Sequence, residues 1–254
     1  MKVFLSGIES SEKNIIDKYI MEGKTVDYIL TSYYYLRKKP LLFDKLKKLA
    51  NSILIDSGAH SFQKGKKVNW LDYTNEYAEW IKQNDTNKII GYFEMDVDNI
   101  IGYDKVLELR KILERVSNKI IPVWHKNRGI EEYKKMCKDY AGKIVAITGF
   151  KNEDIKDEQY LMFLKYAKQY NCKVHCLGMT RTSLLNNCPF DFVDSSTWKQ
   201  AGNFGEYRTF EKGKITIHKM KGKYKTTELD EMNFEQFRKM QEFYYNKWKK
   251  ICKD

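Results

Sequence analysis

The sequence predicts an α/β protein of the (β/α)8 barrel class, and three features indicate this fold. Short runs of β-branched and aromatic residues alternate with longer charged stretches that have helical periodicity. Several of these apolar runs end in a carboxylate or a histidine, and in a barrel the catalytic groups lie at the carboxyl ends of the strands. The length of 254 residues suits one barrel domain, so we expect a single domain over residues 1–254.

Eight apolar runs are expected to form the strands of the barrel. They cover residues 3–5, 28–31, 53–55, 89–93, 120–124, 144–147, 173–176 and 190–193. The stretches between them are expected to be helical at residues 11–21, 33–50, 70–82, 101–116, 130–140 and 157–170, with a short helical turn at 181–186. An open doubly wound sheet is the alternative, which we disfavour because no glycine-rich phosphate motif follows the first run.

The pattern changes after the eighth run. Residues 207–210 and 215–220 flank a turn that contains Gly213, which predicts a β-hairpin within an insertion over residues 206–226. Apolar residues then recur at helical spacing over residues 231–252. We expect this C-terminal helix to close the barrel as its eighth helix.

Composition and charge favour a polyanionic partner. The chain has 46 Lys plus Arg against 34 Asp plus Glu, a formal charge of +12, and cationic surfaces bind phosphates with release of counterions. A lysine-rich solvated surface is the alternative. Aromatic residues among the cations in residues 33–39, Tyr-Tyr-Tyr-Leu-Arg-Lys-Lys, favour nucleic acid.

Cysteine usage and hydropathy predict a cytoplasmic protein with no membrane partner. The five cysteines contain no Cys-x-x-Cys pair, as is typical of a reducing compartment. The N-terminal apolar run is too short for a signal peptide, and no stretch approaches the roughly 20 apolar residues of a membrane span.

Two aspartates at predicted strand ends are the strongest candidates for catalysis. Asp56 ends the third apolar run and Asp194 ends the eighth. Paired carboxylates at a barrel mouth suit general acid–base or covalent catalysis. Either residue alone would more commonly cap the following helix, but the clustering of polar residues at strand ends favours an active site.

Five segments resemble the tRNA-guanine transglycosylase family in their order and spacing. The segments, each compared with its counterpart in that family, are residues 55–59 (the Asp-Ser-Gly-Gly motif), 94–96 (an acidic segment), 145–150 (Ala-Ile-Gly-Gly-Leu), 175–180 (His-Leu-Met-Gly-Val-Gly-Thr) and 190–194 (the run that ends in the nucleophilic aspartate). The resemblance spans residues 53–205. It implies exchange of a guanine base in a nucleic acid for a 7-deazaguanine.

The resemblance also implies roles for individual residues. Asp194 would attack C1′ of the target guanosine, Asp56 would deprotonate the incoming base, and Asp96 would bind its purine edge. Phe62 would stack on the base, and Gly149 would let the backbone approach it closely. The remaining residues expected to bind substrate are Ser57, Gly58, His125, Thr148 and Gly178.

Departures from the family pattern favour its DNA-modifying branch, which occurs in phage genomes. Only His218 and Cys252 follow Asp194 where the family has a zinc cluster, so we expect no metal and no cofactor. His175 is expected to serve core packing together with the cysteines near it. A short chain without the zinc residues favours DNA over tRNA as the substrate, in the host cytoplasm if the gene belongs to a phage.

Two groups of cations are expected to contact the nucleic acid at the barrel mouth. The first is Arg37, Lys38 and Lys39, and the second is Arg181 and Lys199 with the aromatic Trp198. Whether His125 contacts substrate or only packs stays open. A non-catalytic barrel that binds nucleic acid, and a hydrolase that removes a base, remain the alternatives to base exchange.

Overall fold

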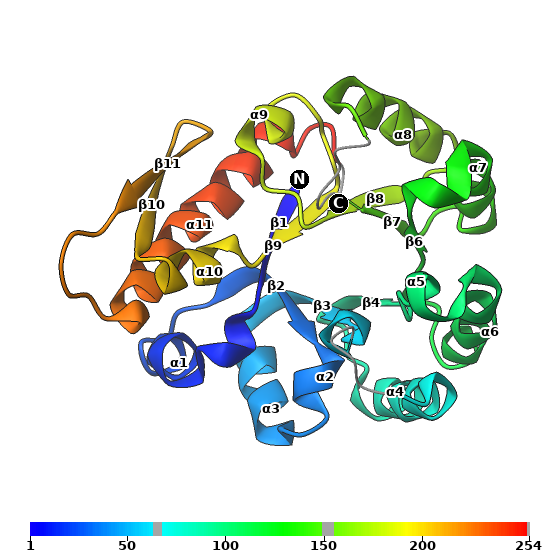
Figure 1. The fold of residues 1–254 in the computed structure, drawn as a ribbon, viewed down its shortest axis with the longest axis horizontal. Helices are drawn as coiled ribbons and strands as arrows, with labels where there is room; N and C mark the ends of the chain where they lie inside the picture. Colours follow the sequence, from blue (N-terminus) through cyan, green and yellow to red (C-terminus); the bar gives the residue numbers. More distant parts are fainter. Residues whose placement is uncertain (63–67, 149–154, 253–254) are drawn as a thin grey trace.

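The computed structural model describes residues 1–62, 68–148 and 155–252, and it is a barrel of parallel strands surrounded by helices (Figure 1). The strands are β1 (Lys2–Ser6), β2 (Val26–Ser32), β3 (Ala50–Asp56), β4 (Ile89–Phe93), β5 (Ile120–Ile121), β6 (Val123–Trp124), β7 (Ile144–Thr148), β8 (Lys173–Leu177) and β9 (Phe192–Ser195). Their order is β5-β4-β3-β2-β1-β9-β8-β7-β6, with every pairing parallel. The predicted (β/α)8 barrel is therefore confirmed.

Pro122 divides the fifth predicted strand into β5 and β6. Proline has no N–H to donate to a neighbouring strand, which interrupts the ladder at this point. β5 pairs with β4 and β6 pairs with β7, and the Pro122 carbonyl still accepts a hydrogen bond of 2.9 Å from the Ala146 N–H. The segment 120–124 thus joins the two edges of the sheet and closes the ring.

The helices lie outside the ring in chain order. They are η1 (Ile8–Ser10), η2 (Glu12–Asp17), α1 (Lys18–Met21), α2 (Tyr33–Leu36), α3 (Pro40–Leu49), η3 (Ala59–Phe62), α4 (Trp70–Asn84), α5 (Asp98–Ile101), α6 (Tyr103–Glu114), η4 (Lys126–Arg128), α7 (Gly129–Asp139), α8 (Asp157–Gln169), α9 (Thr182–Leu185), α10 (Thr197–Asn203) and α11 (Thr226–Trp248). In Figure 1 they form a nearly continuous ring around the strands.

Two helices predicted as continuous are each broken by one residue. The predicted helix over residues 33–50 is two helices, because Pro40 starts α3 and a proline fits only the first turn of a helix. The predicted helix over residues 101–116 is interrupted at Gly102, which has a φ of 83°. The first predicted helix, residues 11–21, consists of the π-helical turn η2 followed by α1.

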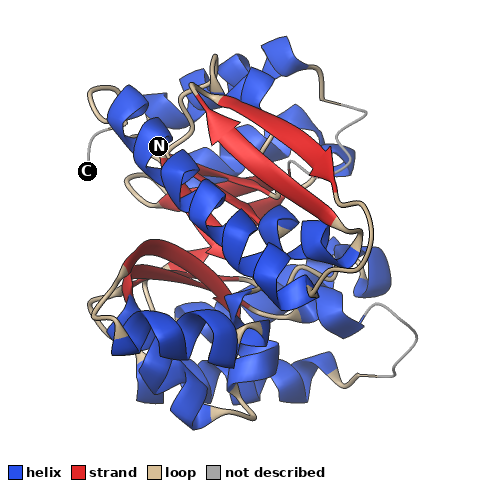
Figure 2. Ribbon diagram, turned by 90° about the vertical axis from the view of Figure 1, so that its left-hand side faces the viewer, coloured by secondary structure: helices blue, strands red, loops and turns tan. Residues whose placement is uncertain are grey.

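The predicted hairpin is present outside the barrel. β10 (Glu206–Glu211) pairs antiparallel with β11 (Lys214–Lys219), and the hairpin lies against α11 (Figure 2). α11 starts at Thr226, five residues before the predicted start, with Glu228 in its first turn where a negative charge is favourable. The Gln241 amide of α11 donates to the carbonyls of Val3 at 2.7 Å and Tyr28 at 2.8 Å, which fixes the helix across β1 and β2.

The core consists of a layer inside the ring and a larger layer between strands and helices. The residues that fill the inside are Phe4, Leu30, Leu54, Phe93, Ile121, Val123, Ala146 and Phe192. Bulky side chains from most of the strands thus make the interior a packed core below the mouth. Across residues 1–62, 68–148 and 155–252, the helices lack the combination of length and apolar character that a membrane crossing needs.

Candidate active site at the carboxyl ends of the strands

The predicted catalytic residues lie at the same end of the barrel. Asp56 is the last residue of β3, Asp194 is the last but one residue of β9, and Asp96 follows β4. The negative charges of Asp96 and Asp194 both raise the pKa of Asp56, in addition to the larger effect of its burial. Three carboxylates from three strands therefore face one space at the barrel mouth.

Three donors hold the Asp194 carboxylate. Its Oδ1 accepts hydrogen bonds from His175 Nε2 at 2.8 Å and from the Gly178 N–H at 3.1 Å, while Oδ2 accepts from the Ser6 hydroxyl at 3.0 Å. None of these donors belongs to a following helix, and the N–H of Thr197 at the start of α10 bonds to Ser195 Oγ instead. Asp194 is thus not a helix cap, and 12% of its side-chain surface stays exposed at the mouth.

His175 was expected to be a packing residue, and its position adds a second role. It is fully buried, with its ring edge-on to Phe93 and stacked against Phe192. A carboxylate only accepts hydrogen bonds, so the His175 tautomer with a proton on Nε2 is the one that can donate to Asp194. Nδ1 then has no hydrogen-bond partner among the described residues. In the sheet, His175 pairs with Ala146 on β7 and with Phe192 on β9, and both of these side chains lie inside the barrel. A strand register predicted from the sequence would therefore have placed His175 inside the barrel, near Asp194.

Asp56 has properties that suit a general base. Burial raises its pKa to about 6, even though the Gly58 N–H donates to Asp56 Oδ2 at 2.8 Å and the Ser32 hydroxyl also lowers the pKa. Gly58 has a φ of 78°, and a Cβ at this position would lie 2.4 Å from Tyr34 Cβ. The turn that aims a backbone N–H at Asp56 therefore requires glycine.

Glu9 is an acidic group of the site that the sequence did not single out. It follows β1, is only 8% exposed, and accepts a hydrogen bond of 3.3 Å from Thr31 Oγ1. Burial, with a smaller contribution from the charge of Asp56, raises its pKa to about 7. Its place a few residues after the first apolar run is the signal that would have identified it.

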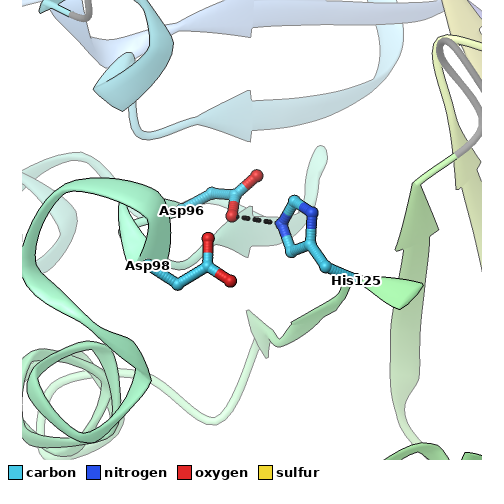
Figure 3. Close-up of side chains that lie close together, drawn as sticks. All are labelled: Asp96, Asp98 and His125. Carbon is cyan, nitrogen blue, oxygen red and sulfur yellow. Dashed lines mark hydrogen bonds and ion pairs between the residues drawn. The ribbon is translucent and has the colours of Figure 1, made fainter. Parts of the chain in front are cut away.

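Asp96, Asp98 and His125 form a second polar cluster (Figure 3). His125 Nε2 lies 2.5 Å from Asp96 Oδ1. Burial lowers the pKa of His125, but the hydrogen bond and charge of Asp96 with the charge of Asp98 outweigh this and raise it. The ligand atoms of the three side chains lie within 4.8 Å of one another, a spacing that a metal ion would fit.

Arg128 argues against a cation at this cluster. Its guanidinium lies 2.9 Å from Asp98 Oδ2 and stacks 4.0 Å from the ring centroid of Tyr103, and its side chain is 4% exposed. The positive charge of Arg128 already neutralises Asp98, so a divalent cation here would meet a buried like charge. The cluster is better suited to present a fixed carboxylate, Asp96, to the mouth.

Two of the predicted substrate contacts, Ser57 and Phe62, have buried side chains. Ser57 is fully buried, and its carbonyl accepts from the Tyr73 hydroxyl at 2.8 Å. Phe62 is 9% exposed and packs edge-on against the rings of Tyr34, Trp70 and Tyr73, so it is not a free stacking surface.

The other predicted substrate contacts include one residue that binds Asp194 and one at a strand end. Gly178 donates its N–H to Asp194, so it positions the carboxylate. Thr148 is half-buried at the end of β7. Gly149 lies outside the described residues.

The predicted nucleic-acid contacts differ in their exposure and in their partners. Trp198 is fully buried and donates its indole N–H to the Ser6 carbonyl at 2.9 Å, so it cannot stack on a base without leaving the core. Lys199 is ion-paired with the buried Asp230. Arg181 pairs with Asp157 at 2.9 Å, and Arg37 pairs with Glu76 at 3.2 Å.

Two predicted cations of the first group keep exposed side chains. Lys38 and Lys39 follow α2 at the mouth end of β2 and are exposed. Tyr35, in the same segment, is 46% exposed, and the charge of Glu9 contributes to a raised pKa of its hydroxyl after the larger effect of burial. Tyr35 is therefore the aromatic residue of this segment that is available to a ligand at the mouth.

No protein-family model matches the chain, and no curated protein matches it.

Proposed function

We propose that this protein is a nucleic-acid guanine transglycosylase, which exchanges a guanine base for a 7-deazaguanine through a covalent intermediate on Asp194. DNA is the favoured polymer and tRNA the alternative. The proposal rests on the resemblance of five segments to the tRNA-guanine transglycosylase family. It rests equally on an aspartate held at a barrel mouth by three hydrogen-bond donors, which leave part of its carboxylate exposed.

In the first half of the proposed reaction, an Asp194 carboxylate oxygen attacks C1′ of the target nucleoside. The C1′–N9 bond breaks, its electron pair leaves with guanine, and a proton completes the departing base. The hydrogen bonds from Ser6, His175 and Gly178 fix the carboxylate so that little reorganisation accompanies attack. The product is a glycosyl ester of Asp194 and free guanine.

In the second half, the incoming 7-deazaguanine loses its N9 proton to Asp56, and N9 attacks C1′ to release Asp194. The raised pKa of Asp56, about 6, suits this step, because a general base works best when its pKa lies near the operating pH. Asp56 passes the proton that it gains to solvent, and the departing guanine takes its proton from solvent, so Asp56 is ionised again at the start of each cycle. Atoms and charge therefore balance over one cycle without a metal or a cofactor.

The remaining mouth residues are suited to recognise the base. Asp96, oriented by His125, can accept hydrogen bonds from the N1–H and amino group of a guanine edge. Tyr35 offers an exposed ring for stacking. The formal charge of +12 suits a polyanionic substrate, and DNA is favoured over tRNA because the chain lacks the zinc cluster of the tRNA enzymes.

The test is incorporation of a labelled base. The protein is incubated with labelled guanine or a labelled 7-deazaguanine and with either DNA or tRNA, and the label in the polymer is measured. Asp194→Asn should abolish both incorporation and a covalent polymer adduct in denaturing gels. Release of guanine without incorporation would indicate a hydrolase, and neither release nor incorporation would indicate a non-catalytic barrel.

A further inference from the structure

A short loop between β11 and α11 carries an unusual density of positive charge. Residues 219–225 read Lys-Met-Lys-Gly-Lys-Tyr-Lys, and we call this segment the basic loop. All four lysines are exposed, Tyr224 is 42% exposed, and Met220 is 38% exposed. The loop presents both cations and apolar surface to solvent.

The basic loop lies beside the C-terminal end of α10, the helix that follows β9 and Asp194. The N–H of Met220 donates to the carbonyl of Gly205 at 2.8 Å, and Gly205 follows directly after α10 and Phe204. α10 in turn begins three residues after Asp194. Figure 1 shows α10 and the hairpin on the same side of the barrel.

Three of the four lysines of the basic loop have no carboxylate partner among the described residues. Within the described part of the chain, Lys219, Lys221 and Lys223 have no carboxylate within ion-pair distance. Lys225 pairs only with the exposed Glu228, at 3.4 Å. When a phosphodiester chain meets cations of this kind, it releases the counterions condensed on its phosphates, and this release favours binding.

An exposed aromatic residue completes the surface. Phe204 is 76% exposed, at the end of α10 and close to the start of the basic loop. Aromatic side chains beside cations suit a nucleic-acid strand, because bases stack on the rings while phosphates meet the charges.

We infer that the basic loop and Phe204 bind the nucleic-acid strand next to the nucleotide that enters the barrel mouth. The inference rests on the proposed function for the identity of its ligand, and it replaces Trp198, Lys199 and Arg181 as the contacts on this side of the barrel. Nucleic acid is favoured over an anionic membrane because the exposed ring of Phe204 suits a base and because the loop adjoins the end of α10, the helix that follows Asp194.

The experiment measures binding without catalysis. Affinity for a fluorescently labelled single-stranded oligodeoxynucleotide is determined by anisotropy over a range of salt concentrations. In the triple variant Lys219→Gln, Lys221→Gln, Lys223→Gln, the slope of log affinity against log salt should fall by about 2, and affinity at 0.1 M salt should fall by roughly tenfold to 100-fold. Phe204→Ala should weaken binding roughly fivefold to 100-fold with an unchanged salt slope.

The matched control removes the same charge from the opposite side of the barrel. Lys138, on α7, and Lys165 and Lys168, on α8, are exposed lysines, and their triple Gln variant should bind with wild-type affinity and slope. Equal losses in the two triple variants, or none in the loop variant, would overturn the inference. Loop-dependent binding to phosphatidylserine vesicles without loop-dependent binding to DNA or tRNA would overturn it as well.

The two proposals, the binding surface and the base-exchange reaction, can be disproved independently of each other. If the loop variant loses affinity and the wild-type protein incorporates no labelled base, the binding surface stands and the transglycosylase proposal falls. If base exchange occurs and the loop variant binds and reacts as the wild type does, the surface is wrong and the proposed reaction stands.

Discussion

His175 Nε2 lies 2.8 Å from Asp194 Oδ1, between two strands that are neighbours in the barrel. The imidazole is fully buried among Phe4, Phe93 and Phe192 and cannot contact a substrate. A polar ring in such surroundings is stabilised only by the hydrogen bond that it makes. We therefore interpret His175 as a positioning residue for the proposed nucleophile.

Replacing His175 should lower the rate of the chemical step and leave substrate binding intact. A hydrogen bond to a charged group contributes about 1.5–3 kcal/mol, so His175→Phe should reduce kcat by roughly tenfold to 150-fold with little change in KM. His175→Gln, which keeps an N–H donor, should recover much of the loss. Rates are divided by the fraction of sites that form the covalent adduct, which corrects for unfolded protein. If His175→Phe only reduced the amount of folded protein, the normalised kcat would equal that of the wild type, and this result would contradict a positioning role.

The pH dependence of base exchange should follow Asp56. A general base works only when it is deprotonated, so the exchange rate should rise with pH through a midpoint near 6 and level off above it. Asp56→Asn should lose most of the activity, and its residual rate should lack this midpoint. Glu9 titrates nearby, with a pKa of about 7, so Glu9→Gln is the control that should keep the midpoint near 6. A midpoint that persists in Asp56→Asn would assign the titration to another group.

The fold and the main carboxylates could be predicted from sequence because both depend on local patterns. A buried parallel strand is an apolar run, and a polar residue at its end lies at the mouth whichever strand carries it. The helix breaks at Pro40 and Gly102 were also visible in the sequence, yet the surrounding helical periodicity outweighed them in the prediction.

The partners of those carboxylates could not be predicted, because they depend on contacts between distant parts of the chain. Ser6 and Asp194 are separated by 188 residues, and only the pairing of β1 with β9 brings them together. Trp198 and Lys199 were predicted to bind nucleic acid from their residue types alone. Their burial and ion pairing follow from the packing of α10 against α11, which no local pattern specifies.

Replacement of Gly58 by alanine should disrupt the turn that holds Asp56. The new Cβ would lie 2.4 Å from Tyr34 Cβ and 2.8 Å from Ser32 Oγ, at a φ of 78° that L-residues rarely adopt. We expect a loss of about 2–4 kcal/mol in the free energy of unfolding, measured by urea denaturation, and loss of base exchange. Gly23→Ala is the matched control, since Gly23 has a φ of 65° but no atom within 4 Å of the new Cβ, and it should lose only roughly 1 kcal/mol. Equal losses in the two variants would show that the close contacts at Gly58 are unimportant.

Asp56→Asn should make the protein more stable at neutral and higher pH. Burial raises the pKa of Asp56 from 3.8 to about 6, so between these values the folded protein retains a proton that the unfolded chain has lost. The free energy of unfolding therefore falls as pH rises through this window. Above pH 6 the carboxylate is charged in the folded protein, and the full free-energy cost of burying that charge lowers the stability. Each pKa unit corresponds to about 1.4 kcal/mol, which limits the gain in Asp56→Asn to about 3 kcal/mol at pH 8.

An asparagine at this position can still accept the hydrogen bond from the Gly58 N–H, so the variant removes the charge and keeps the turn. The gain should shrink as pH falls and should be nearly absent at pH 4, where Asp56 is protonated in the folded state. Urea denaturation at pH 4 and pH 8 measures this difference, with Asp27→Asn, at an exposed position, as a control that should change stability by less than about 0.5 kcal/mol. A stability gain of the same size at both pH values would show that the gain does not come from the ionisation of Asp56. A loss of stability at pH 8 would show that the charged carboxylate stabilises the folded protein.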